Sequence, residues 1–328
     1  MTKIDDFGVT SRVAVTVLVD NRADLMVLST RNVRRFTQAP LLAEHGFAAL
    51  IELKAEGVTI LWDAGMTEAT FMENVRRMKV NLSRVTAIVL SHAHGDHTAG
   101  ITAALKAMAL HPRERKWSPN TPWEEIERYA AGRRVPLVAH SAAFRERWGV
   151  DQDGSRHGPG MGLPRSEWEA AGAEIVLADR PHRLAPGCWT TGQVPRNSFE
   201  QAGRPKRLVF REGRQWCPDD LEEDQAIVIH VANKGLVVVS GCAHSGIVNT
   251  VNHAREISGV DRVFAILGGF HLARANEQER KQTIAAIQQF EPRLIAPTHC
   301  TGFPAMAEFS AEMPGAFVEG VVGTKYLF

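Results

Sequence analysis

The 328-residue sequence predicts an α/β fold in which helices are layered on β-sheets. Two observations carry this prediction. Residues 85–90 (VTAIVL) form a continuous apolar run of strand length, which is typical of a central strand that is buried on both faces. In the last third of the chain, strand patterns alternate with helix patterns over short connections, as they do in successive βα units.

The first third contains strands that are followed by helices. Residues 12–20 alternate and are rich in valine, which predicts a strand. Two apolar runs at 47–53 and 58–63 are separated by four residues that end in glycine, which predicts a β-hairpin. Residues 68–80 carry apolar side chains at helical spacing, and residues 101–110 predict a further helix.

The middle of the chain, residues 111–187, differs because much of it is rich in proline, glycine, arginine and tryptophan. One helix is predicted at 122–131 and one strand at 135–139, whereas the composition of 151–164 predicts a loop. We expect this stretch to be an insertion over a sheet edge and not an independent domain. Its four tryptophans either line a substrate pocket or hold the insertion together: Trp117, Trp123, Trp148 and Trp168.

Regular alternation returns after residue 224. The expected elements are strands at 225–231 and 236–240, a helix at 247–257, a strand at 263–267, a helix at 277–290 and a strand at 294–296. We expect one domain over residues 1–328, which the insertion interrupts.

Composition excludes several classes of function. Lys+Arg 38 against Asp+Glu 37 gives a net charge of +1, which removes the electrostatic argument for a dedicated nucleic-acid or membrane-surface protein. No apolar run approaches the roughly 18–20 residues of a spanning helix, and the first residues predict no signal peptide. Four widely spaced cysteines do not resemble a disulfide framework. We therefore expect a cytoplasmic protein that binds a small molecule; its oligomeric state is left open.

The chemical centre is a histidine-rich loop that directly follows the buried strand at 85–90. Its sequence, SHAHGDH, places three imidazoles and one carboxylate within six residues. Such a loop can turn His92 and His94 to one side and Asp96 and His97 to the other, so that two adjacent divalent ions share it. These ligands suit Zn, Fe or Mn better than Ca or Mg. The alternative is a solvated histidine-rich loop.

The HxHxDH pattern after a hydrophobic strand resembles the signature of the metallo-β-lactamase superfamily. Asp63, which ends the run ILWDAG, resembles the Asp-X-Gly strand end of the same superfamily. Further motifs resemble its 7,8-dihydropterin-6-yl-methyl-4-(β-D-ribofuranosyl)aminobenzene-5′-phosphate synthase-like branch: TGQVPR (191–196), GCAHSGIVN (241–249), GGFHL (268–272) and THCTG (298–302). The resemblance extends from about residue 13 to 301 and is weakest over the insertion. It implies an αββα sandwich with an inserted cap-like region.

The resemblance also implies a set of ligands for two divalent metal ions. His92 and His94 match the histidines of the first metal, and His244 is our choice for its remaining ligand. Asp96 and His97 match ligands of the second metal.

Three further residues extend this set. His299 resembles the last histidine ligand of the superfamily. Cys242 stands where hydrolases of this superfamily have a bridging aspartate, and it is either a thiolate ligand or a small buried residue. Asp63 is expected to hold the histidine loop through hydrogen bonds behind the metal ligands.

Catalytic and substrate-binding roles fall to three residues. Asp96 is expected to orient a water molecule as well as to bind a metal. His271 is expected to protonate a leaving group, although ligation of a metal or capping of the next helix are alternatives. Arg196 is either a phosphate-binding residue or a solvated loop arginine.

The resemblance implies a dinuclear-metal enzyme that acts on a phosphorylated or pterin-like small molecule. It would use metal-bound water or a diphosphate held by the metals, with Zn as the expected ion and Fe or Mn as alternatives. Two other hypotheses remain. One is a general metallohydrolase, such as a phosphodiesterase or a lactonase. The other is a protein that binds a ligand in a metal-dependent manner without turnover.

Overall fold

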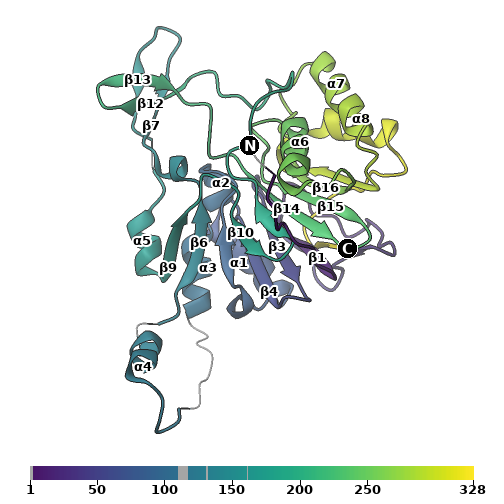
Figure 1. The fold of residues 1–328 in the computed structure, drawn as a ribbon. Coiled ribbons are helices and arrows are strands. Elements are labelled where there is room, and N and C mark those ends of the chain that lie inside the picture. Colours follow the sequence, from purple (N-terminus) through teal and green to yellow (C-terminus); the bar gives the residue numbers. More distant parts are fainter. Residues whose placement is uncertain (1–2, 110–116, 131, 161) are drawn as a thin grey trace.

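The structure is a computed structural model that describes residues 3–109, 117–130, 132–160 and 162–328. Two β-sheets pack face to face and helices cover their outer faces (Figure 1). This αββα sandwich confirms the predicted fold class. The predicted helix ends at 110 and 131, and the start of the expected insertion at 111, lie outside the described residues.

The first sheet has eight strands in the order β2-β18-β1-β3-β4-β5-β6-β9. Strands β3 and β4 pair antiparallel, as the predicted hairpin requires, and β4, β5, β6 and β9 are parallel neighbours. The bounds are β1 Val13–Val19, β2 Val33–Arg35, β3 Ala48–Leu53, β4 Val58–Trp62, β5 Ala87–Val89, β6 Val135–Ala139, β9 Ala173–Leu177 and β18 Thr324–Leu327.

The second sheet has six strands in the order β10-β11-β14-β15-β16-β17. Its last three strands are parallel, because each is joined to the next through a helix. The bounds are β10 Arg183–Ala185, β11 Cys188–Thr190, β14 Ala226–Val231, β15 Gly235–Ser240, β16 Val263–Gly269 and β17 Leu294–Thr298.

The helices lie on the two outer faces. Those on the first sheet are α1 Glu68–Arg77, α3 Ile101–Ala109 and α5 Arg165–Ala170; those on the second are α6 Ile247–Ser258, α7 Glu277–Gln288 and α8 Phe303–Glu312. The short helix α2 Gly95–Thr98 lies in the histidine loop, and α4 Trp123–Ala130 projects from the sandwich. Three 3₁₀ turns are η1 Leu82–Arg84, η2 Ser141–Phe144 and η3 His299–Thr301.

Three apolar layers stabilise this arrangement. The layer between the sheets takes alternate residues of each strand, such as Val13, Val15 and Val17 of β1. A second layer lies between the first sheet and its helices, and a third lies between the second sheet and α6, α7 and α8. Each fully buried Val, Leu, Ile or Phe contributes about 1.5–3 kcal/mol, so the layers hold the strand ends in fixed relative positions.

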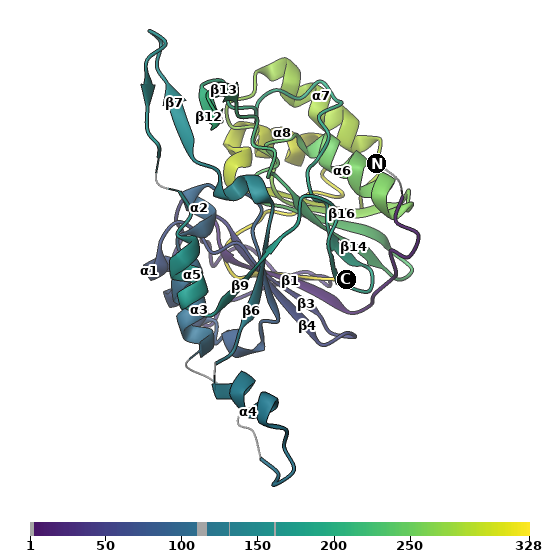
Figure 2. The ribbon, with the colours of Figure 1, turned by 60° about the vertical axis from the view of Figure 1, so that its left-hand side comes forward.

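Residues 111–187, expected to form one insertion, take part in the sandwich at several places. Strands β6 and β9 extend the first sheet and β10 begins the second. A separate four-stranded sheet projects from the sandwich (Figure 2), with the strand order β13-β12-β7-β8. Its bounds are β7 Arg147–Val150, β8 Arg156–His157, β12 Leu208–Glu212 and β13 Gln215–Pro218. The expected loop at 151–164 therefore contains a two-residue strand, which is too short to leave a periodic pattern.

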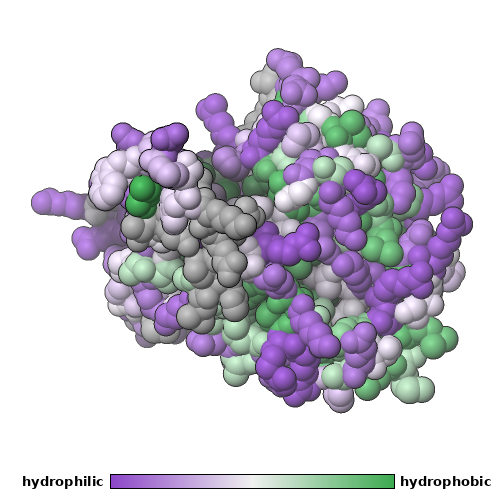
Figure 3. Space-filling view, turned by 90° about the horizontal axis from the view of Figure 1, so that it is seen from below, coloured by the Kyte–Doolittle hydropathy of each residue, from purple (hydrophilic) through white to green (hydrophobic). Residues whose placement is uncertain are grey.

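On the side seen from below, hydrophilic residues are interspersed with small hydrophobic groups (Figure 3). Among the described residues, no helix has both the length and the apolar character needed to cross a membrane.

Candidate metal centre

The predicted site residues follow strand ends of both sheets. Asp63 follows β4, the loop from His92 to His97 follows β5, Cys242 and His244 follow β15, His271 follows β16, and His299 follows β17. Carboxyl ends of parallel strands meet at one edge of a sheet. Because both sheets present this edge to the same side of the sandwich, residues from the two halves of the chain meet there.

A buried hydrogen-bond network organises the histidine loop. Asp63 is fully buried, and its Oδ1 accepts from the Ser91 backbone N–H at 2.8 Å. Its Oδ2 accepts from the Ser91 hydroxyl at 2.6 Å and from His97 Nδ1 at 2.7 Å. Since a carboxylate only accepts, His97 carries its proton on Nδ1 and leaves Nε2 free to bind a cation. The structure therefore places Asp63 where the sequence predicts it, behind a ligand.

The close approach of β15 to this loop requires a glycine. A Cβ on Gly241 would lie 2.1 Å from the Ser91 Oγ. Gly241 thus lets the loop that carries Cys242 and His244 pack directly against the loop that carries His92.

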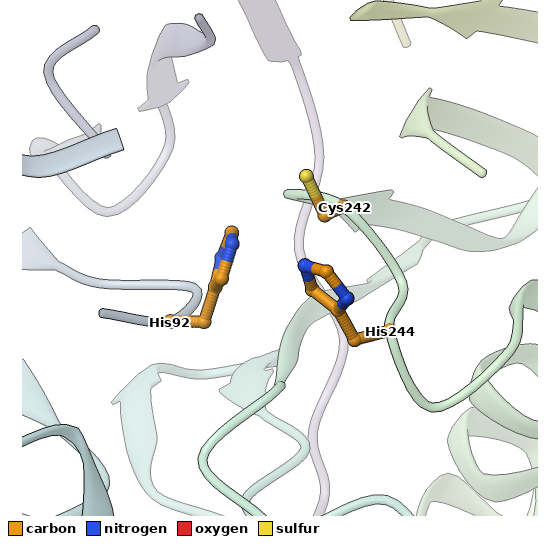
Figure 4. Close-up of side chains that lie close together, drawn as sticks. All are labelled: His92, Cys242 and His244. Atoms are coloured by element: carbon orange, nitrogen blue, oxygen red, sulfur yellow. The ribbon is translucent and has the colours of Figure 1, made fainter. Parts of the chain in front are cut away.

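The first group of ligand atoms comes from His92, His94, Cys242 and His244. His92 enters from one side, and Cys242 and His244 enter from the opposite side (Figure 4). One ligand atom from each of these three residues lies within 4.8 Å of the other two, and His92 Nε2 lies 2.9 Å from His94 Nδ1. The structure brings together all the residues that the sequence assigns to the first metal.

The protonation pattern of this first group suits a cation. Because the Ser91 hydroxyl donates to Asp63, its oxygen accepts from His92 Nδ1 at 2.8 Å, and His92 Nε2 is left without a proton. His244 Nδ1 donates to the Gly203 carbonyl at 2.8 Å. Its Nε2 is buried and has no hydrogen-bond partner among the described residues.

Burial also favours the neutral form of these imidazole rings, which is the form that suits a cation. It lowers the pKa of His92 and of His244 well below the usual value, and it lowers the pKa of His94 to about 4. Neighbouring imidazoles add to this effect. These histidines are therefore neutral at pH 7, and neutral imidazole is the form that binds a metal.

The second group comes from Asp96, His97, Cys242 and His299. The Nε2 atoms of His97 and His299 are 3.2 Å apart, and the Cys242 Sγ is 3.2 Å from His97 Nε2. Asp96 Oδ2 lies 3.4 Å from His299 Nε2 and 3.7 Å from His97 Nε2. Burial opposes ionisation of Asp96, but its hydrogen bond with His299 and the surrounding imidazoles lower its pKa. Cys242 is the residue common to both groups.

Two residues that the sequence analysis did not single out hold His299. Asn21 Oδ1 accepts from His299 Nδ1 at 2.9 Å, and the His299 backbone N–H donates to Asp20 Oδ1 at 3.1 Å. Asp20 also accepts from the Thr298 hydroxyl. His299 Nε2 is consequently the atom that faces the second group. The available signal was Asp20, the acidic residue directly after β1, because Asp63 directly follows β4 in the same way.

His45 is a third residue that the sequence analysis did not single out, and no signal in the sequence pointed to it. Its Nε2 lies 3.3 Å from Asp96 Oδ2, and it forms a further group of ligand atoms with Asp96 and His299. It lies in an irregular segment before β3, with no neighbouring motif.

His271 lies beside the first group. Its ring centroid is 4.1 Å from that of His244, and its Nδ1 is buried without a hydrogen-bond partner among the described residues. It also gathers with Cys242 and Cys300. Burial disfavours its charged form, but a hydrogen bond with Cys300 outweighs this and raises the pKa of His271. This position is compatible with both expectations, proton transfer and ligation.

Arg196 braces the loop of His244. One Nη group donates to the His244 carbonyl and the other to the Asp220 carbonyl. Its substrate-binding role stays a prediction, since the two hydrogen bonds that the structure gives it serve the backbone behind the site.

Comparison with known proteins agrees with the geometry. The family model described as metallo-beta-lactamase superfamily matches residues 43–154. The 7,8-dihydropterin-6-methyl-4-(beta-D-ribofuranosyl)-aminobenzene-5′-phosphate synthase of Methanocaldococcus jannaschii is 29% identical over 284 residues, which cover 85% of this chain and 88% of the relative.

Solved structures share the fold. Tm1679, described as a metal-dependent hydrolase of the beta-lactamase superfamily, has a TM-score of 0.68 at 20% identity and covers 95% of this chain and 98% of its own. The metallo-beta-lactamase fold protein YhfI from Bacillus subtilis has a TM-score of 0.51 at 11% identity, with 97% and 100% coverage. Proteins of this superfamily generally bind divalent metals. The chain therefore has the metallo-β-lactamase fold, matches the family model over residues 43–154, and is similar along most of its length to the methanogen synthase.

Proposed function

We propose that the chain is a dinuclear-metal enzyme that acts on a phosphorylated or pterin-like small molecule. The observation that carries this proposal is the orientation of four imidazole rings. Each ring donates through Nδ1 to an oxygen behind it and presents an unprotonated Nε2 to the same space: His92, His97, His244 and His299. Unprotonated nitrogens that face one another, as His97 Nε2 and His299 Nε2 do at 3.2 Å, repel each other, and a metal ion bound to both would remove this repulsion.

Two ions, rather than one, are supported by the arrangement of the ligands in two groups. The first would be held by His92, His94 and His244, and the second by Asp96, His97 and His299, with Cys242 available to both. Zinc is the expected ion because imidazole and thiolate are its common ligands, with iron or manganese as alternatives. Such ions would supply Lewis-acid activation of a water molecule or of a phosphate oxygen.

The remaining residues would hold substrate and protons. Asp96 lies at the edge of the second group with one oxygen near three imidazoles, where it would orient a water or an amine through a hydrogen bond. His271 would hold a proton at its unpartnered Nδ1 for the leaving group. Glycines at 268 and 269 let the backbone before His271 pack directly against the end of β15, because a Cβ there would lie 2.1 Å from the Ser240 carbonyl oxygen or 2.5 Å from the Gly241 carbonyl oxygen.

The pterin-like substrate class is supported by the relative that is 29% identical over most of both chains. In that reaction class, a C–N bond forms between an aryl amine and the exocyclic carbon of a dihydropterin, diphosphate leaves, and the amine loses a proton. The test is to supply a hydroxymethyl-dihydropterin diphosphate and a ribofuranosyl-aminobenzene 5′-phosphate to the purified protein. The coupled product is then measured by mass spectrometry, together with free diphosphate.

A hydrolytic activity is the second candidate, and the position of His271 favours it. A proton donor beside the ligand groups suits the departure of an alkoxide from a phosphodiester or lactone. Turnover of simple phosphodiesters or lactones that is lost in His271→Ala, with metal retained, would support hydrolysis over transfer. Tight binding of a pterin diphosphate with no turnover of either substrate class would instead indicate a binding protein.

Metal content provides the common test. Elemental analysis of the purified protein is expected to give up to two equivalents of a transition metal, and His92→Ala is expected to lose the first equivalent. His157→Ala is a matched control, because His157 lies on the projecting sheet with its side chain 68% exposed. Absence of metal in the wild type, with no effect of His92→Ala, would overturn every function proposed for this site.

A further inference from the structure

A second concave site lies on the outer face of the first sheet, away from the histidines. It is a cavity of about 370 Å³ between the end of α1 and the strands β1, β2, β3, β4 and β18. Thr16 and Thr59 line it, each four residues before the aspartate that supports the metal centre, Asp20 or Asp63. Four strand residues span about 13 Å, so the cavity is distinct from the candidate metal centre.

The strand register fixes the floor of this cavity. Arg34 on β2 pairs with Lys325 on β18, Lys325 pairs with Thr16 on β1, and Thr16 pairs with Leu50 on β3. Residues paired in this way lie on one face of a sheet. Val15 and Val17 belong to the layer between the sheets, so Thr16 and the rest of this row point to the outer face.

Positive charge predominates around the cavity. Its lining includes Arg34, Arg35, Lys79, Arg84 and Lys325 but a single carboxylate. That carboxylate, Glu52, pairs with Lys325 at 2.6 Å. Within the described part of the chain, no ion pair engages the remaining four cations. Like charges directly opposite each other across a strand pair, as Arg34 and Lys325 are, destabilise a sheet.

Lys79, one of the residues that line the cavity, has an unfavourable backbone conformation. It follows α1 with φ 55°, in the left-handed region. The Val80 N–H bonds to the Val75 carbonyl and the Lys79 N–H to the Arg76 carbonyl, which makes Lys79 the C′ residue of a Schellman motif. Glycine is the usual residue at this position because it lacks the Cβ penalty. The motif fixes the backbone of Lys79 at the point where this residue lines the cavity.

Two polar side chains also line the cavity, and one of them has no hydrogen-bond partner among the described residues. Thr16 is 6% exposed, and its Oγ1 has no hydrogen-bond partner among the described residues. Arg35 is half-buried and donates to the Thr324 hydroxyl. Burial lowers the pKa of Arg35, and the charges of Tyr326 and Glu319 act in the opposite direction. Phe36, Leu50 and Met78 add an apolar part to the wall.

We propose that this cavity is a binding site for a small phosphorylated molecule with an aromatic or apolar portion. The guanidinium and ammonium groups would take the phosphate oxygens, and the Thr16 hydroxyl would supply or accept a further hydrogen bond. The apolar wall would take the rest of the molecule, in the size range of ordinary ligand pockets. Nothing in this proposal requires the metal centre to turn over the same compound.

The test uses the protein as purified and phenylphosphonate as a probe that cannot be hydrolysed. Isothermal titration is carried out on the wild type, Lys79→Gly, Arg35→Gln and His92→Ala. Lys281→Gln, at an exposed position of α7, is the control. We expect a binding event that His92→Ala and Lys281→Gln leave unchanged and that Lys79→Gly and Arg35→Gln each weaken at least tenfold.

Lys79→Gly also separates loss of binding from loss of folding. Glycine adopts the left-handed backbone conformation at this position without strain, so the variant should not lower the midpoint temperature of thermal unfolding. If Arg35→Gln fails to fold, Lys79→Gly decides alone. Unchanged binding in Lys79→Gly, loss of all binding in His92→Ala, or no binding by the wild type would each overturn the proposal. Equal affinity for benzoate would overturn the phosphate specificity.

Discussion

Asp63→Asn tests how the metal centre is supported. The wild-type carboxylate accepts three hydrogen bonds: from the Ser91 N–H, from the Ser91 hydroxyl and from His97 Nδ1. An asparagine keeps the shape but replaces one oxygen by an NH₂ group, so at least one buried donor faces another donor. Asp63 is fully buried, and water cannot repair the mismatch.

The cost follows from these contacts. An unsatisfied buried donor costs about 1–3 kcal/mol, and a hydrogen bond to a charged acceptor contributes about 1.5–3 kcal/mol. We expect the metal-free variant to lose roughly 2–4 kcal/mol of unfolding free energy. Because His97 would no longer be fixed in the Nδ1–H tautomer, metal affinity should fall about 10- to 100-fold.

Two measurements check this prediction. Urea unfolding in the presence of a chelator gives the stability of the metal-free protein, and competition with a zinc-binding dye gives the affinity. Asp153→Asn is the matched control, since Asp153 is exposed and its carboxylate bonds only to Ser155. An Asp63→Asn protein with wild-type stability and wild-type affinity would refute the role assigned to this network.

Three other changes have defined outcomes. The Glu200 carboxylate accepts hydrogen bonds from the Val248 and Asn249 N–H groups at the start of α6, both at 3.0 Å. Glu200→Ala should therefore lower the free energy of unfolding in urea by about 2 kcal/mol. An unchanged free energy of unfolding would exclude this capping role. Burial raises the pKa of Glu223 from 4.5 to about 7. The folded protein therefore binds this proton more tightly than the unfolded chain, and stability falls as pH rises from about 4.5 to 7. A rise in the pKa of Glu223 from 4.5 to about 7 corresponds to about 3 kcal/mol, so Glu223→Gln should remove up to that much of the fall in unfolding free energy. If the unfolding free energies of the wild type and of Glu223→Gln changed in parallel with pH, this prediction would be contradicted. Cys242→Ser should weaken zinc binding at least tenfold in the dye competition, since a hydroxyl is a poor zinc ligand; unchanged affinity would reduce Cys242 to a packing residue.

The sequence predicts the centre of this site better than its surroundings. His92, His94, Asp96 and His97 lie in one loop after a strongly apolar strand, so their proximity follows from local spacing. His244 and His299 each follow a strand that is buried and parallel to its neighbour, and the end of such a strand is a predictable place. These elements were predicted within a few residues of their observed bounds.

The supporting residues were not predictable in the same way. Asn21 and His45 reach the site from irregular segments whose paths depend on packing across the whole sandwich. Strands β2 and β8 have three and two residues, which is too few for a periodic pattern. Arg196 was assigned to phosphate from its residue type, whereas its observed partners are backbone carbonyls that only the folded loops bring near it.

The position of β18 has a consequence for the order in which the protein can mature. This strand, Thr324–Leu327, lies between β2 and β1 in the first sheet. While residues 324–327 are still unsynthesised, β1 pairs with β3 on one side only, and Asp20 and Asn21 follow a strand whose other edge is open. His299 depends on both of them, so the second ligand group cannot reach its final geometry on a growing chain. The second ligand group should therefore reach its final geometry only after β18 has been synthesised and has paired with β1 and β2.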